Sequence, residues 1–100
     1  NFLDILPSEF ALNQNYPNPF NPSTNIKFAL KERAITTLEI FNILGESVHT
    51  VVDEALGAGY YNYRLDMGAF ASGMYFYKLT ATNESGTQLF NSMKKMILLQ

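Results

Sequence analysis

The clearest fold signal in this chain lies at residues 73–82, which read GMYFYKLTAT. Successive side chains of a strand point to opposite faces, so Tyr75, Tyr77 and Leu79 would share one face. Aromatic residues such as these favour strands over helices. The stretch therefore predicts a strand, and its apolar content predicts a central position in a sheet.

The same alternation recurs outward from this stretch in both directions. Between the alternating segments lie turn sequences that contain Asn and Gly, such as NILG at residues 42–45 and NESG at residues 83–86. Residues 54–59 read EALGAG, and the two glycines limit any helix there to a single turn. The further predicted strands are residues 10–12, 25–30, 36–42, 47–52, 60–65 and 87–99.

Seven short strands separated by turn residues at roughly ten-residue spacing are typical of an all-β protein. We therefore predict an antiparallel immunoglobulin-like β-sandwich, with a small open barrel as the competing fold. The length of 100 residues and the 47% share of apolar residues predict a single folded domain.

Composition also excludes several classes of function. A formal net charge of −2 argues against a nucleic-acid partner or a polybasic membrane surface. No apolar run approaches the roughly 18 residues that span a bilayer, so we expect no membrane insertion. The sequence has no Cys, which removes thiolate catalysis and zinc–thiolate sites.

Patterns that carry catalysis are weak. His49 is the only histidine, and its strand parity predicts a place on the solvent face. A triplet of Ser72, His49 and Asp66 can be written, but nothing in the sequence brings the three together. Neither a two-histidine motif nor a calcium loop is present. We therefore predict a noncatalytic domain without cofactor or metal.

The segment at residues 15–24, NYPNPFNPST, is the least ordinary in the chain. Its three prolines fix their own φ angles and push the preceding residues toward extended conformations, so the loop is stiff. We expect Tyr16 and Phe20 to pack against the sheet, which would make this loop a rigid cap. The sequence leaves open whether one of its X-Pro bonds is cis.

Aromatic residues permit a second interpretation. If Tyr60 and Phe76 both point outward, they can form a flat platform that stacks on sugar rings, as in a carbohydrate-binding accessory module of a secreted hydrolase. The favoured interpretation is that Tyr61 and Tyr63, like Tyr75 and Tyr77, fill the core. A purely structural spacer is a third candidate.

Several motifs, in order along the chain, resemble those of the type IX secretion C-terminal sorting domains. The resemblance extends from about Pro7 onward, and the immunoglobulin-like domain of the flagellar hook-cap protein shares its middle motifs. The segments that carry it are NYPNPFNPST (15–24), IKF (26–28), FNILGESV (41–48), GY (59–60), ASGMYFYKL (71–79) and KMILL (95–99).

The resemblance implies a sorting domain that directs an N-terminal passenger to the cell surface or medium. The implied partners are an outer-membrane secretion translocon, reached through the periplasm, and a surface sortase that removes the domain. Residues 1–8 would then be a linker from the passenger, with cleavage near it, and residues 9–100 the sorting domain. We expect a monomer.

By the same resemblance, the machinery would recognise two strands. The recognition residues carried over are Gly73, Tyr75, Lys95, Met96, Ile97, Leu98 and Leu99. Physically, a terminal strand near a sheet edge can offer its backbone to a receptor by strand addition, with Lys94 and Lys95 facing an acidic surface. The alternative is that this strand lies inside its own sheet and that recognition uses loops.

Overall fold

The computed structural model describes residues 6–100, which form two sheets and contain no helix. This part of the chain therefore holds no helix that crosses a membrane. The strands are β1 (Ala11–Leu12), β2 (Ser23–Leu30), β3 (Ala34–Phe41), β4 (Ser47–Leu56), β5 (Gly59–Asp66), β6 (Gly73–Thr82) and β7 (Gln88–Leu98).

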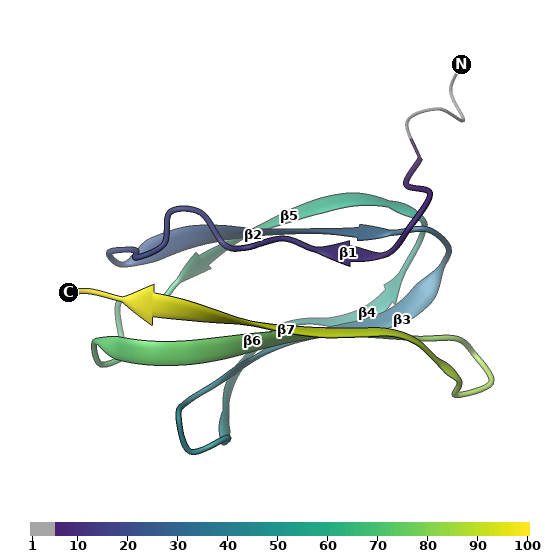
Figure 1. Ribbon diagram of the computed structural model, residues 1–100. Coiled ribbons are helices and arrows are strands. Elements are labelled where there is room, and N and C mark those ends of the chain that lie inside the picture. Colours follow the sequence, from purple (N-terminus) through teal and green to yellow (C-terminus); the bar gives the residue numbers. More distant parts are fainter. Residues whose placement is uncertain (1–5) are drawn as a thin grey trace.

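The two sheets pack as layers (Figure 1). One sheet has the order β1-β2-β5 and the other the order β4-β3-β6-β7, and every pairing between these strands is antiparallel. The predicted immunoglobulin-like sandwich is confirmed. β6, the strand with the clearest sequence signal, lies between β3 and β7, as expected.

The core lies between the sheets and follows the alternation of the strands. Tyr77 and Leu79 of β6 are fully buried, as is Ile26 of β2 in the facing sheet. Tyr61 and Tyr63 are half-buried against this core and stack on Phe28, with ring centroids 5.2 and 5.7 Å apart. The tyrosines therefore supply core volume, as the sequence predicted.

Residues 54–59 form no helical turn, and the strand expected to end at residue 52 is longer than predicted. β4 continues to Leu56, which pairs with Ala34 of β3, while Glu54 pairs with Thr36. Ladder hydrogen bonds to an existing neighbour strand outweigh the weak local helix preference of this stretch. Gly57 and Ala58 alone connect β4 to β5.

Both predicted turns are confirmed. In the first, Gly45 has a φ of +82° and the side-chain oxygen of Asn42 accepts hydrogen bonds from the backbone of Leu44 and Glu46. In the second, Gly86 has a φ of +88°. Positive φ carries no Cβ penalty in glycine, which explains its place in both turns.

Candidate recognition site at the C-terminal strand

The predicted recognition residues meet on two neighbouring strands. In the β6–β7 ladder, Gly73 pairs with Leu98 and Tyr75 pairs with Met96. Both strands belong to the four-stranded sheet, and β7 forms one of its edges. The structure thus brings together residues that lie more than twenty positions apart in the sequence.

Burial divides these residues into two groups. Met96 and Leu98 are fully buried, and Tyr75 is buried with its hydroxyl donating a hydrogen bond of 2.7 Å to the carbonyl of Ala71. Gly73, Lys95 and Leu99 are exposed, and Ile97 is half-buried. A receptor that contacts the folded domain therefore reaches only the second group.

The edge of the terminal strand is covered by the proline loop. The carbonyl of Ile97 accepts a hydrogen bond from the N–H of Phe20 at 3.0 Å, and the N–H of Leu99 donates to the carbonyl of Phe20 at 2.9 Å. The side chain of Asn18 accepts from the N–H of Ile97 at 3.0 Å. Further up the strand, Gln14 Nε2 donates to the carbonyl of Lys95 at 2.7 Å. The sequence predicted that this loop caps the sheet, but no pattern placed the cap at the edge of β7.

Buried polar groups hold the loop in place. Asn15 is only 2% exposed, and its side-chain amide donates to Pro17 O and to Thr24 Oγ1, both at 3.1 Å. The Tyr77 hydroxyl accepts from the N–H of Asn15 and donates to the carbonyl of Asn13, both at 2.7 Å. Burial raises the pKa of Tyr77 from 10.0 to about 12.

The expectation for the loop was half right. Phe20 is buried, but Tyr16 is 80% exposed. The backbone of Tyr16 forms two hydrogen bonds with Asn25, in an antiparallel bridge. Since neighbouring side chains of an extended segment point in opposite directions, burial of Asn15 turns Tyr16 outward. The bonds preceding all three prolines of this loop are cis.

The end of the chain is also anchored. Ser72 Oγ donates to the carbonyl of Gln100 at 3.0 Å and accepts from the N–H of Gln100 at 2.9 Å. The side-chain amide of Gln100 donates to the carbonyl of Phe70. The loop between β5 and β6 thus fixes the residues that follow β7.

The catalytic triplet is not assembled. Ser72 bonds with Gln100, and Asp66 accepts a hydrogen bond from the backbone of Gly68. His49 is exposed, as predicted, and its ring lies 6.3 Å from that of Phe70. Within residues 6–100, no group of three His, Cys, Asp or Glu side chains is placed to hold a metal ion.

The aromatic platform is not formed either. Tyr60 is 69% exposed on β5, in the three-stranded sheet, whereas Phe76 is half-buried on β6, in the four-stranded sheet. Their inward neighbours Tyr61 and Tyr75 pack on the shared core, so Tyr60 and Phe76 occupy opposite outer faces of the sandwich. One flat sugar-stacking surface built from both rings is therefore excluded.

Comparison with known families decides the affiliation. The family described as the secretion system C-terminal sorting domain matches residues 14–97, a range that begins just before the proline loop and ends within β7. The chain belongs to this family. No curated protein matches it.

Membership in this family indicates the role of the domain. A sorting domain of this family is the C-terminal signal for type IX secretion, and its role is to direct a passenger rather than to catalyse a reaction. It implies a passenger on its N-terminal side, the type IX secretion machinery as partner, and export to the cell surface or medium. The sorting-domain match covers the proline loop and β7 as far as Ile97.

Proposed function

We propose that the type IX machinery reads this sorting domain in its folded state, through the surface at which β6 begins and β7 ends. In this proposal Gly73, Lys95, Ile97 and Leu99 contact the receptor, and Tyr75, Met96 and Leu98 shape that surface from the core. The observation that carries the proposal is the hydrogen-bonded cover over the edge of residues 95–99.

This cover argues for recognition by a face rather than by strand addition. A receptor strand that paired with the edge would first have to break the bonds from Gln14, Asn18 and Phe20. A receptor strand would replace each of these hydrogen bonds with one of its own, so the number of hydrogen bonds would not increase. Displacing the loop therefore contributes little binding free energy. Exposed side chains, in contrast, can contact a receptor without breaking any hydrogen bond of the domain.

We further propose the path of export. The passenger and domain would cross the periplasm, pass the outer-membrane translocon as a monomer, and be separated by a surface sortase within residues 1–8. Residues 1–5 of this proposed linker lie outside the described residues, and the proposed domain covers residues 9–100. The antiparallel two-sheet topology also supports the proposed relation to the immunoglobulin-like domain of the flagellar hook-cap protein.

An export assay tests the proposed site. Residues 1–100 are fused behind a periplasm-directed fluorescent passenger in a host with the translocon, and the exported fraction is measured. We expect the double variant Lys95→Glu, Leu99→Ser to lower export about tenfold, because both changed side chains are exposed in the proposed contact.

The matched control is Lys27→Glu, which reverses an exposed lysine on β2 in the other sheet. Export of the control should equal that of the parent domain. If the double variant is exported as well as the control, the proposed contact surface is wrong. If the parent domain itself leaves the passenger in the periplasm, the whole proposal fails.

A further inference from the structure

The outer face of the three-stranded sheet carries a shallow groove lined mainly by polar side chains and two tyrosines. Two adjoining hollows of about 350 and 380 Å³ make up this groove. The residues that define it are Asn13, Tyr16, Asn25, Lys27, Tyr60 and Asn62. We call this surface the amide groove.

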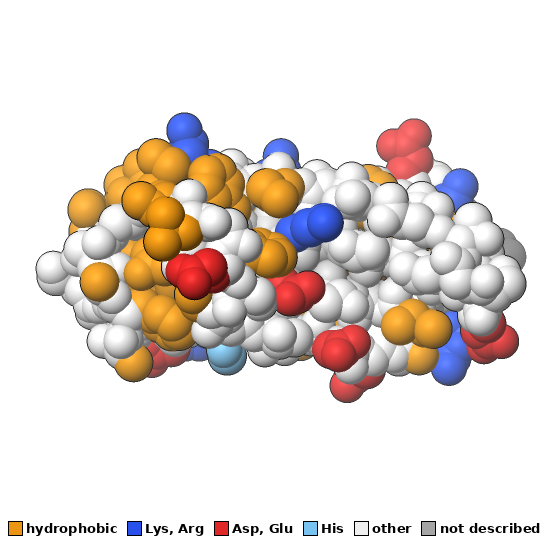
Figure 2. All heavy atoms as spheres, turned by 90° about the horizontal axis from the view of Figure 1, so that it is seen from below, with side chains coloured by type: hydrophobic (Ala, Val, Ile, Leu, Met, Phe, Trp, Pro, Cys, Tyr) orange, Lys and Arg blue, Asp and Glu red, His pale blue; other side chains and the backbone are white. Residues whose placement is uncertain are grey.

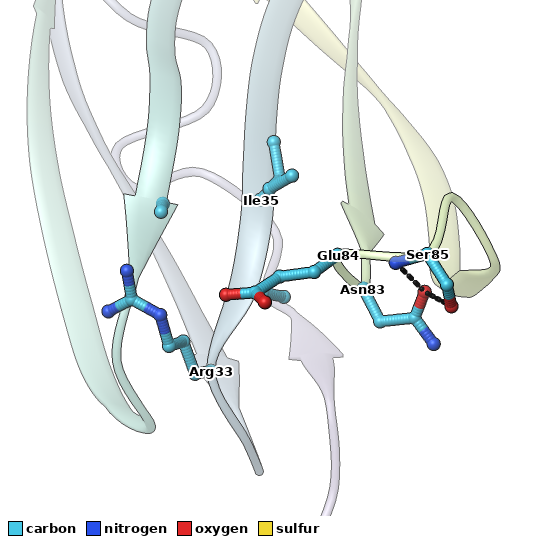
Figure 3. A pocket seen from close by; sticks show the side chains of 7 residues that line it. Arg33, Ile35, Asn83, Glu84 and Ser85 are labelled. Atoms are coloured by element: carbon cyan, nitrogen blue, oxygen red, sulfur yellow. Dashed lines mark hydrogen bonds between the residues drawn. The ribbon is translucent and has the colours of Figure 1, made fainter.

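The amides of this groove take no part in holding the fold together. In the turn shown in Figure 3, by comparison, the side-chain oxygen of Asn83 accepts hydrogen bonds from the backbone and the hydroxyl of Ser85. Within residues 6–100, the exposed side chains of Asn13, Asn25 and Asn62 make no hydrogen bond with another residue. Asn25 and Asn62 also lie inside strands, where Asn is disfavoured. Residues that break a local rule without a structural gain point to a function.

Exposed tyrosine rings stand at the two ends of the amide groove. Tyr16 is 80% exposed and Tyr60 is 69% exposed. Tyr16 bridges to Asn25, and Tyr60 pairs with Ala29, which lies four residues further along β2. The two tyrosine positions are therefore about 13 Å apart along β2 and on opposite sides of it, a separation that an oligosaccharide of about three sugar units spans. Unlike the excluded pair of Tyr60 and Phe76, these two rings flank the same strand.

Lys27 lies in the middle of the amide groove without an acidic neighbour. It pairs with Asn62 in the β2–β5 ladder, and its carbonyl accepts a hydrogen bond from the N–H of Asn13. Its neighbours on the same face of β2 are Asn25 and Ala29. None of these four residues carries a carboxylate, so no adjacent charge neutralises the ammonium group.

The balance of charge differs between the two outer faces of the sandwich. Asp66 is the one carboxylate of the β2–β5 ladder, and it lies at the far end, opposite Ser23 and two residues after Arg64. On the four-stranded sheet, Glu39 pairs directly with Lys78, and Figure 2 shows acidic and basic side chains next to each other in the middle of that face. The face of the β2–β5 ladder therefore carries a net positive charge.

The amides, the tyrosines and the lysine match one class of ligand. A side-chain amide offers donors and an acceptor side by side, which fits the neighbouring hydroxyl groups of a sugar. Tyrosine rings stack on the apolar faces of sugar rings. A lysine ammonium group pairs with the carboxylate of an acidic sugar. An extended peptide is a poorer fit, because β2 lies between β1 and β5 and offers no free backbone edge in the groove.

We propose that the amide groove binds an acidic glycan of about three or more sugar units, with Tyr16 and Tyr60 stacked on sugar rings and the carboxylate of a central sugar facing Lys27. The inference goes beyond the proposed function, which places its contacts on the other sheet. The two proposals therefore fail independently: loss of glycan binding leaves the export assay unchanged, and the reverse holds as well.

Retention on immobilised polysaccharides tests the ligand class. The chain of 100 residues is applied to polygalacturonate, alginate and hyaluronan, and to each of them after chemical reduction of its carboxylates to primary alcohols. We expect at least one acidic polysaccharide to retain the domain, with binding to its reduced form at least about tenfold weaker. Retention on none of the three, or equal retention on the acidic and the reduced forms, overturns the proposal.

Two pairs of substitutions test whether the groove is the binding site. Asn25→Thr, Asn62→Thr introduces residues that favour strands, so we expect stability to be kept or raised while the affinity falls about tenfold. Tyr16→Ser, Tyr60→Ser removes both exposed rings and should abolish retention, whereas Tyr16→Phe, Tyr60→Phe keeps the rings and should bind. Binding of either the threonine or the serine variant at the level of the parent domain overturns the proposal.

Matched controls for the amides and the lysine lie on the other sheet. Asn91→Thr and Lys95→Gln change exposed residues of β7 and should bind like the parent domain. Lys27→Gln should lower the affinity about tenfold and make it less dependent on salt, because it removes the central charge. If Lys95→Gln lowers retention as much as Lys27→Gln does, binding is a nonspecific effect of charge and the proposal is wrong.

Discussion

The backbone N–H of Asn15 donates a hydrogen bond of 2.7 Å to the hydroxyl of Tyr77, sixty-two positions further along the chain. This bond joins the proline loop to the central strand β6, and the same hydroxyl donates to Asn13. Because the loop in turn covers the edge of β7, one buried phenol supports the geometry of the whole candidate site.

Removal of that hydroxyl should destabilise the domain. We expect Tyr77→Phe to lower the free energy of unfolding by about 1–3 kcal/mol, since it leaves the N–H of Asn15 buried without an acceptor. Denaturant unfolding measures the change. Tyr60→Phe, at an exposed position, is the control and should shift stability by less than about 0.5 kcal/mol. Equal effects would contradict a supporting role for the Tyr77 hydroxyl.

Alkaline pH should act on the same group. The pKa of Tyr77 is raised by burial from 10.0 to about 12, so above pH 10 the unfolded state releases this proton while the folded state retains it. Stability is therefore complete below pH 10 and falls as the pH rises toward 12. Burial and the charge of Glu54 raise the pKa of Tyr63 as well, which adds a loss in the same direction.

The measurement for this pH dependence is thermal unfolding between pH 8 and pH 12, compared between the parent domain and Tyr77→Phe. The variant should show a shallower alkaline decline, because one of the two shifted tyrosines no longer titrates. If the melting temperatures of the two proteins fall equally steeply with pH, Tyr77 contributes nothing to the alkaline loss of stability.

The two leucines near the end of the chain should behave differently. Leu98→Ala should cost about 2–5 kcal/mol, because Leu98 is fully buried in the core. Leu99→Ala should change stability by less than about 0.5 kcal/mol, because Leu99 is 53% exposed. Calorimetry on the pair checks this, and a stable Leu98→Ala domain would refute the assigned packing.

The cover over β7 can be opened at one point. Asn18→Ala removes the acceptor for the N–H of Ile97, so hydrogen exchange at that amide should accelerate while global stability falls by less than about 1.5 kcal/mol. Asn21→Ala, at an exposed loop residue with no described side-chain hydrogen bond, serves as the control. Unchanged exchange at Ile97 would mean that Asn18 does not protect it. Increased export of Asn18→Ala would favour strand addition over recognition by a face.

Much of the fold was predictable because it rests on local rules. Alternation of apolar residues predicted β6 and the inward orientation of Tyr61 and Tyr63, and Asn with Gly predicted the two turns. The family was likewise readable from motifs in order. The strand and turn signals depend on residues only a few positions apart, where strand periodicity and turn geometry act directly.

Errors arose where a partner strand or loop overruled local preference. Residues 54–56 extend β4 because β3 supplies their hydrogen bonds, and Tyr16 points outward because Asn15 takes the inward position. The alternation of side chains predicted that Tyr60 and Phe76 point outward. Their strands belong to different sheets, however, so the two rings lie on opposite faces of the sandwich.

The amino-acid sequence alone predicted most of the strands, their inward faces and the two turns, and its motifs indicated the family. Tertiary structure alone decided which end of β7 is covered and which of the predicted recognition residues are exposed. The reason is the distance along the chain: the contacts from Gln14 to Lys95 and from Asn18 to Ile97 span 81 and 79 positions. Such contacts join segments that lie far apart along the chain, and no local pattern encodes them.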